Sequence, residues 1–406
     1  MRTDETRVGV GVAAPRQSTR ATLGRWRPLV TFLPIGVAVV SGTHYYLWMR
    51  LVRDVGFPTS IDHALTVMLV LAAASVPTGV VASRLVSPRW SVWWLAPVYV
   101  WIGTAFYLVL AAGIIDFLRL VLELVTFEQP EIERIGPEAG ATLIATWGVG
   151  AATLAVLEAR TLRVEHVEIH LSKLPRALDG FRIAQISDVH VGPIVGRRFL
   201  KRVVSKVNDL DADVVVITGD LVDGSVEDLA HDVAPLASLE STFGTFFVTG
   251  NHEYHSGAPN WCAHLPTLGV RVLRNEHVVL ERDGHGLDLA GIDDYEATHF
   301  DIGHGADLAR ATEGRDARRP LILLAHQPKA IHEAVRYEVD LQLSGHTHGG
   351  QLWPLRWLLR LSDPFVAGLG RLGDTRVYVS RGTGHSGPPM RLGAPAEITH
   401  IVLRAT

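Results

Sequence analysis

Aspartate, asparagine and histidine recur at five places in the second half of the sequence, each directly after a short apolar run. The places are Asp188-Val189-His190, Gly219-Asp220, Gly250-Asn251-His252-Glu253, His326 and Gly345-His346-Thr347-His348. A lone aspartate in such a position usually caps a helix or closes a turn, and a lone histidine is usually a hydrogen-bonded structural residue. Because five such places in one chain are improbable by chance, they favour a shared binding site.

The residue types in these places suit a pair of divalent metal ions. Two neighbouring ions need a bridging carboxylate, further oxygen ligands and neutral imidazoles that leave positions open for water and substrate. The absence of thiolates favours manganese, iron or zinc in a reactive site over a structural zinc cage. The lone cysteine, Cys262, excludes an intrachain disulfide. Glycines 219, 250 and 345 are expected to let the backbone turn sharply and approach the ions.

The apolar runs before these residues predict buried strands. They cover residues 181–187, 213–219, 244–250, 321–326 and 339–345, with helices predicted at Arg198–Asn208 and Val226–Leu239. Strands that alternate with helices indicate a layered α/β domain, and the segments after Gly373 add strands without an intervening helix. Ligands of open α/β sheets bind beyond the carboxyl ends of strands, so the five places are expected to meet there.

Taken in order, D-x-H, G-D-x-x-D, G-N-H-E, a strand-end histidine and G-H-T-H resemble the calcineurin-like metallophosphoesterase superfamily. The resemblance runs from about Leu162 to Thr406, and the closing "SRGTGHSGPPMRLGAPAEITHIVL" is similar to its membrane-associated bacterial branch. It implies a four-layer α/β/β/α sandwich. It also implies that a hydroxide between two divalent ions hydrolyses phosphomonoesters or phosphodiesters.

The resemblance also assigns roles at the matching positions. Asp188, His190 and His348 would hold the first ion, Asp220 would bridge, and Asn251, His326 and His346 would hold the second. His252 would lie near the leaving oxygen as a general acid or hydrogen-bond donor, with support of a ligand as its structural alternative. Asp223 and Glu253 are expected to orient ligands or backbone. No role is expected for His255, His285, His304 and His332, while His385, in the glycine-rich "RGTGHSG", could reach the cleft rim.

The first 160 residues carry the apolar excess of the chain. Four stretches approach the length that a helix needs to cross a bilayer: Leu29–Trp48, Ala64–Ser83, Val92–Ile115 and Ala141–Leu157. The last is short and contains glycines, so a buried soluble helix is its alternative. The expected organisation is a flexible basic segment at 1–28, an all-α transmembrane region of about four helices at 29–160, and a phosphoesterase domain at 161–406.

Basic residues beside the spans predict the orientation in a bacterial cell membrane. Arginines before the first stretch, with Arg84 and Arg89, place both segments inside, and the acidic segment 123–138 suits the outside. Arg50 and Arg53 fit this scheme less well. Four spans would make a multi-pass protein with a cytoplasmic catalytic domain, whereas three would place that domain outside.

The segment "LRWLLRLSDPFVAGLGRL" (355–372) combines tryptophan and leucine with arginine, which is typical of an interfacial segment. Its alternative is a cap packed on the domain itself. The expected partners are a phosphate ester, with a phospholipid or lipid-linked substrate in view, and the lipid bilayer. A net charge of −4 without a basic patch gives no reason to expect nucleic acid, and no protein partner is predicted. A non-catalytic metal- or phosphate-binding sensor or scaffold is the alternative function, against which the complete ligand set counts.

Overall fold

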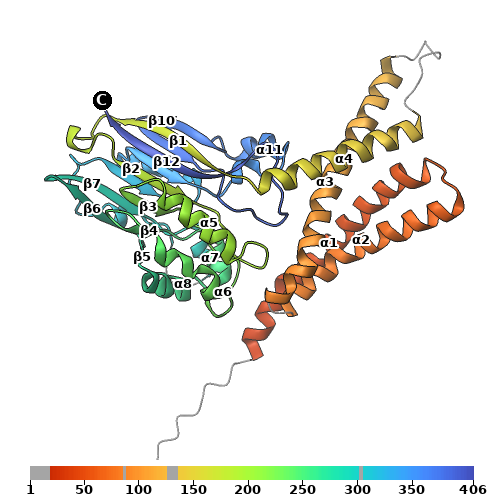
Figure 1. Cartoon of the computed structure of the whole chain (residues 1–406), viewed down its shortest axis with the longest axis horizontal. Coiled ribbons are helices and arrows are strands. Elements are labelled where there is room, and N and C mark those ends of the chain that lie inside the picture. The colour runs from red at the N-terminus through yellow and green to blue at the C-terminus, as the bar shows by residue number, and fades with distance from the viewer. Residues whose placement is uncertain (1–18, 86–87, 126–135, 301–304) are drawn as a thin grey trace, which may run out of the picture.

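The N-terminal part of the molecule is helical. The computed structural model describes residues 19–85, 88–125, 136–300 and 305–406 (Figure 1). The helices are α1 (Thr19–Trp48), α2 (Thr59–Leu85), α3 (Pro88–Val125) and α4 (Pro137–Ala159), with a π-helical turn at Met49–Arg53 after α1. Residues 1–18, the segment 126–135 and His304, on which expectations were placed, lie outside the described residues.

Two stretches of these helices are both long and apolar enough to cross a bilayer. They are Thr59–Gly79 in α2 and Pro137–Ala159 in α4. About four spans were expected. Within the described residues, length and hydropathy support two of them. The glycines of the short fourth stretch do not interrupt α4, which runs unbroken over 23 residues.

The rest of the chain forms two six-stranded sheets within the described residues. The first has the order β1 (Leu162–Leu171), β12 (Ala396–Ala405), β2 (Arg182–Ile186), β3 (Val214–Ile217), β4 (Thr245–Phe247) and β5 (Val270–Val272). The second has the order β10 (Gly368–Leu372), β11 (Thr375–Val379), β9 (Leu341–Ser344), β8 (Leu321–Leu324), β7 (His285–Gly291) and β6 (Glu276–Arg282). Strands β2 to β5 pair in parallel, as do β7, β8, β9 and β11.

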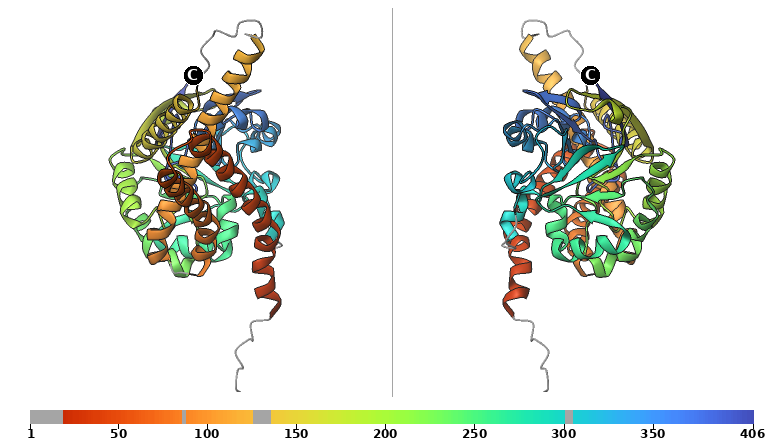
Figure 2. Two further views of the ribbon diagram at one scale, coloured as in Figure 1. Left: turned by 90° about the vertical axis from the view of Figure 1, so that its right-hand side faces the viewer. Right: turned by 90° about the vertical axis from the view of Figure 1, so that its left-hand side faces the viewer.

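The two sheets pack face to face, and helices cover their outer faces (Figure 2). Ile183 and Val216 of the first sheet meet Leu289 and Leu343 of the second in one buried core. Helices α5 (Arg197–Asn208), α6 (Val226–Val233) and α8 (Ala258–His264) pack on the first sheet, and α9 (Leu308–Ala311) and α10 (Ile331–Ala334) on the second. Strands such as β3 and β8 are buried at every residue because both faces are covered. Their apolar runs are continuous for that reason.

One predicted helix is shorter than expected. The segment Val226–Leu239 was predicted as a single helix, but α6 ends at Val233 and residues Ala234–Ser238 form a 3-10 turn. Pro235 explains the difference, because proline has no N–H to donate and its ring crowds the preceding turn. The sheet is unaffected, since Leu236 remains buried in the same core as Val233.

The α/β part packs directly on α3 and α4. Tyr107 of α3 and Ala155 of α4 share a buried cluster with Leu352 and Met390. The backbone N–H of Arg391 donates to the carbonyl oxygen of Ala155 at 2.8 Å. These contacts join the helices to the loops that follow β9 and β11.

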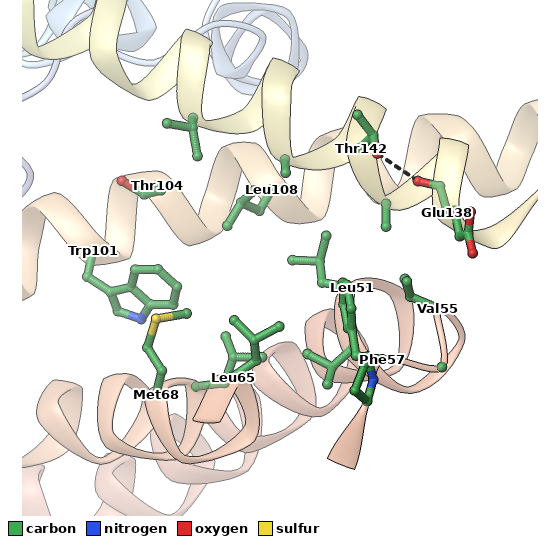
Figure 3. A pocket seen from close by; sticks show the side chains of 17 residues that line it. Leu51, Val55, Phe57, Leu65, Met68, Trp101, Thr104, Leu108, Glu138 and Thr142 are labelled. Atoms are coloured by element: carbon green, nitrogen blue, oxygen red, sulfur yellow. Dashed lines mark hydrogen bonds between the residues drawn. The ribbon is translucent and has the colours of Figure 1, made fainter. Parts of the chain in front are cut away.

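Residues of α2, α3, α4 and the turn after α1 line an apolar pocket (Figure 3). Its volume is about 640 Å³, and Trp101, Thr104 and Leu108 are its α3 residues. Leu65 and Met68 of α2 face them, and Glu138 is the one charged residue of the lining.

Candidate metal centre

The structure brings together all eight residues predicted for the site. They are Asp188, His190, Asp220, Asn251, His252, His326, His346 and His348, and they follow the carboxyl ends of β2, β3, β4, β8 and β9. Because these strands are parallel within each sheet and the sheets lie face to face, their ends meet at one edge of the sandwich.

Two groups of ligand atoms can be distinguished at this edge. In the first, His190 Nε2 lies 3.0 Å from His348 Nε2, which lies 3.5 Å from Asp188 Oδ1. In the second, His326 Nε2 lies 3.2 Å from Asp220 Oδ2 and 3.2 Å from His346 Nδ1. Ligands at about 2.0–2.2 Å from one ion lie roughly 3–3.5 Å apart. Both groups therefore have spacings that suit a small cation.

Asp220 connects the two groups. Its Oδ2 lies 3.2 Å from His326 Nε2 and 3.9 Å from His190 Nε2, which belong to different groups. Asn251 Oδ1 adds an amide oxygen to the second group, 3.0 Å from His346 Nδ1. The arrangement offers one carboxylate in reach of both groups, as a bridging ligand requires.

The ionisation states of two candidate ligands fit cation binding, whereas His190 and His326 would have to lose a proton to bind an ion: burial lowers the pKa of each, but neighbouring aspartates outweigh it and raise that pKa. Burial, together with the charges of His190 and Arg391, lowers the pKa of His348 well below its ordinary value, so the imidazole is neutral and can act as a ligand. Burial alone would raise the pKa of Asp220, but its interactions with His326 hold that pKa well below its usual range. Oδ2 of Asp188 is buried and has no hydrogen-bond partner among the described residues. A buried carboxylate oxygen without a partner is costly unless it binds a cation.

Asp223 orients two of the histidines. Its Oδ1 lies 3.0 Å from His190 Nδ1 and 2.6 Å from His252 Nδ1. A hydrogen bond at Nδ1 fixes the ring and leaves Nε2 free to face the site. Burial lowers the pKa of His252, but the hydrogen bond to Asp223 and the charges of Asp220 and Asp223 outweigh it and raise that pKa to about 9. His252 can thus carry a proton near neutral pH.

Glu253 holds the backbone under the site. Its two carboxylate oxygens accept hydrogen bonds from the N–H groups of Asp220, Leu221, Val222 and Gly250, at 2.7–3.3 Å. These bonds tie the turn after β3 to the turn after β4. A role in orienting the backbone, as the sequence suggested, accounts for all four.

The backbone is strained where the candidate ligands lie. Asp188, His190, Asp220, His346 and His348 all have φ between 51° and 72°. This left-handed region costs a residue other than glycine about 1–3 kcal/mol and persists only where the surroundings impose it. The fold therefore imposes unfavourable backbone conformations at five of the seven candidate ligands.

The three glycines act in two different ways. Gly219 has φ +87°, so the expected sharp turn needs a glycine there. The same expectation is wrong for Gly250, which has φ −102°, and Gly345 is likewise outside the left-handed region. Both are required for space: a Cβ on Gly250 would overlap the Asp220 side chain, and one on Gly345 would overlap Ser187 and Asp188.

Sequence reasoning missed Arg391 entirely. Its side chain is fully buried and donates to the carbonyl oxygens of Arg381 and Ala394, both at 2.8 Å. Its Nη2 also lies 3.3 Å from His348 Nδ1. Its sequence context, "PPMRLG", is that of an ordinary exposed turn and gives no sign of burial.

Comparison with known proteins agrees with this site. The chain matches the calcineurin-like phosphoesterase family over residues 181–350. It is 46% identical over 250 residues to the "Transmembrane protein with metallophosphoesterase domain" of Danio rerio, which covers 60% of this chain and 57% of that protein. It is 36% identical over 250 residues to an uncharacterized metallophosphoesterase of Aquifex aeolicus (61% of this chain, 94% of that protein). It is 33% identical over 279 residues to one of Bacillus subtilis (67% and 95%).

The fold and the arrangement of candidate ligands thus match the class of metallophosphoesterases. The chain belongs to the calcineurin-like metallophosphoesterase family. It spans less than two thirds of the length of the Danio rerio relative.

Proposed function

We propose that this protein is a membrane-anchored phosphoesterase that hydrolyses phosphomonoesters or phosphodiesters with a pair of divalent ions. The observation that carries the proposal is the position of Asp220, within 3.2 Å of His326 and 3.9 Å of His190, between two groups of candidate ligands. Asp188, His190 and His348 would hold one ion; Asn251, His326 and His346 would hold the other. When bound, the ions activate water as the nucleophile and neutralise the charge on the phosphoryl oxygens.

The remaining residues complete this proposal. His252 would donate a proton or a hydrogen bond to the leaving oxygen, which its raised pKa of about 9 supports. Asp223 would hold the ring of His252 in place through the hydrogen bond at Nδ1. The nitrogen and oxygen donors suit manganese, iron or zinc.

Turnover by the purified full-length chain tests this function. With added manganese, iron or zinc we expect release of nitrophenol from p-nitrophenyl phosphate or its bis ester, and loss of turnover on chelation. Phospholipids and nucleotide diphosphates in the same assay would identify the substrate class. Metal or phosphate binding without turnover of any of these esters would instead support the sensor or scaffold.

In this proposal the helical region at 29–160 is the membrane anchor. A basic segment precedes it, and the phosphoesterase domain at 161–406 follows it. Two apolar helical stretches and the similarity to a relative named as a transmembrane protein support it. The chain ends of α1 and α4 nearest the α/β part would face the cytoplasm of a bacterial cell, as the arginine distribution predicts.

Helix α11 (Leu355–Ser362) supports contact with the bilayer. None of its residues is buried, and Trp357, Leu358 and Leu361 are 60%, 62% and 85% exposed. The neighbouring Trp353 ring lies 6.3 Å from Trp147 of α4, which is 12 residues before Ala159 and so about 18 Å along the helix. Helix α11 thus lies beside the apolar helix α4, about 18 Å from the end of α4, with its leucines exposed. This placement suits contact with the lipid interface better than packing as a cap on the domain.

A nitroxide label at Leu361 tests this placement. In a Cys262→Ser background, a labelled Leu361→Cys chain in lipid nanodiscs is expected to collide with oxygen more readily than with a water-soluble relaxation agent, because the residue would lie among lipids. A label at Arg318, on the exposed side of the domain, is the control and should show the opposite preference. Equal water accessibility at both labels would contradict an interfacial α11.

A further inference from the structure

A pocket beside the candidate metal centre is closed on one side by α3. Its volume is about 200 Å³. His190 and Asp223 form its wall toward the metal centre, His385 and Gly387 form a second wall, and the loop 192–195 forms a third. Leu95 and Tyr99, from the helical N-terminal region, complete the lining.

We propose that α3 forms part of the substrate site and makes the enzyme selective for amphiphilic phosphoesters. The phosphate would lie at the metal centre, and the apolar part of the substrate would lie against Leu95 and Tyr99. The inference rests on the proposed phosphoesterase function and assigns its substrate class.

Helix geometry explains how α3 can serve both the pocket and the bundle. Leu95 and Tyr99 are four residues apart and share one face of the helix. Trp101 and Leu108 are about 180–200° around the helix from Tyr99, and they line the apolar pocket of the helices (Figure 3). Leu95 is buried, so this face of α3 lies against the α/β part.

The lining of the pocket combines polar and apolar residues. Asp223 and His190 are polar, while Ile194 and Val195 stand with Leu95 among its apolar residues. A sugar or nucleoside against these aliphatic side chains would place hydroxyl groups there, with the cost of lost hydration. An acyl or alkyl group would bury favourably in the same place. The aliphatic residues therefore favour a substrate that carries an apolar group beside its phosphate.

His385 lies in the wall of the pocket. The neighbouring Gly384 sits against the backbone of Val189, where a Cβ would overlap the carbonyl oxygen, so the loop is held close to the candidate ligands.

Paired substrates test the inference on the full-length chain in mixed micelles. Phosphatidic acid and phosphatidylglycerol are compared with glycerol phosphate and glycerophosphoglycerol, their deacylated analogues, with products followed by phosphorus NMR. We expect kcat/KM of the wild type to favour an acylated member, and Tyr99→Ala to reduce that preference about tenfold or more, since hydrophobic contacts of this size discriminate by 10–200-fold. Trp94→Ala is the matched control, because Trp94 lies on the same helix and is 71% exposed.

The outcomes separate this inference from the proposed function. A wild type that turns over p-nitrophenyl phosphate but shows no preference for acylated substrates would overturn the inference and leave the phosphoesterase intact. The same holds if Tyr99→Ala and Trp94→Ala keep equal preferences. If Tyr99→Ala does not fold, as shown by loss of its cooperative thermal unfolding transition, Leu95→Ala provides the second test on the same wall. A wild type without any metal-dependent turnover would overturn both proposals.

Discussion

Replacing Asp220 with asparagine is expected to reduce kcat about 10³-fold or more and to lower the metal content from two ions per chain to one or none. The proposed role of Asp220 is to bridge both ions, and its Oδ1 also accepts the N–H of His252 at 2.9 Å. An asparagine side chain carries no negative charge and presents N–H donors on one side. Because metal stabilisation of a transition state is worth several kcal/mol, its loss corresponds to at least three powers of ten.

Metal analysis and turnover on the same preparation measure this effect. Asp209→Asn is the matched control, since Asp209 is exposed at the end of α5, before β3, whereas Asp220 follows the other end of that strand. The control should keep both the metal content and kcat of the wild type. An Asp220→Asn protein with two bound ions and full turnover would contradict a bridging role.

Replacing Arg391 with methionine is expected to destabilise the α/β part by about 3 kcal/mol or more. Methionine fills much of the same volume but leaves the carbonyl oxygens of Arg381, Gly384 and Ala394 without their donor. Each buried acceptor that loses its partner costs about 1–3 kcal/mol. The guanidinium tolerates its burial because these carbonyls surround it, although burial lowers the pKa of Arg391 to about 10.

Thermal unfolding of the detergent-solubilised chain measures this loss. A change of about 3 kcal/mol in a domain of this size should lower Tm by roughly 6 °C or more. Arg318→Met serves as the control, because Arg318 is 91% exposed and its ion pair with Asp316 is at the surface. Its Tm should stay within about 2 °C of the wild type, as surface pairs contribute little. Equal Tm values for both variants would show that the buried hydrogen bonds of Arg391 are dispensable.

The strands that carry the site were predictable, whereas the edge strands β6 and β10 of the second sheet were not. Buried runs such as "DVVVITG" and "LILLAH" indicate strands because both of their faces are covered. Strand β6 is only partly buried, and its sequence "EHVVLER" has charged ends around an apolar run of only three residues. Strand β10 contains two glycines in five residues. Neither pattern exceeds what a loop would show, so tertiary pairing decides both strands.

The residues of the candidate metal centre were predictable because their types are chemically unusual after strands. Their support was less so. Glu253 lies in the first turn of α7 (Asn251–Ser256) and caps that helix by accepting the N–H of Gly250. Its other three hydrogen bonds depend on how the turn after β3 approaches the turn after β4. Arg391 and Tyr99 are each more than 40 residues from any candidate ligand in sequence, and neither lies in a motif that indicates a role in the site. Only the packing of the loops on α3 and α4 brings them near the site.

Anomalous diffraction from crystals of the full-length chain grown with manganese tests the central claim most directly. We predict two manganese peaks per chain: one in contact with Asp188, His190 and His348, the other with Asn251, His326 and His346, and Asp220 in contact with both. A single peak, or peaks that do not share Asp220, would contradict the two-ion site.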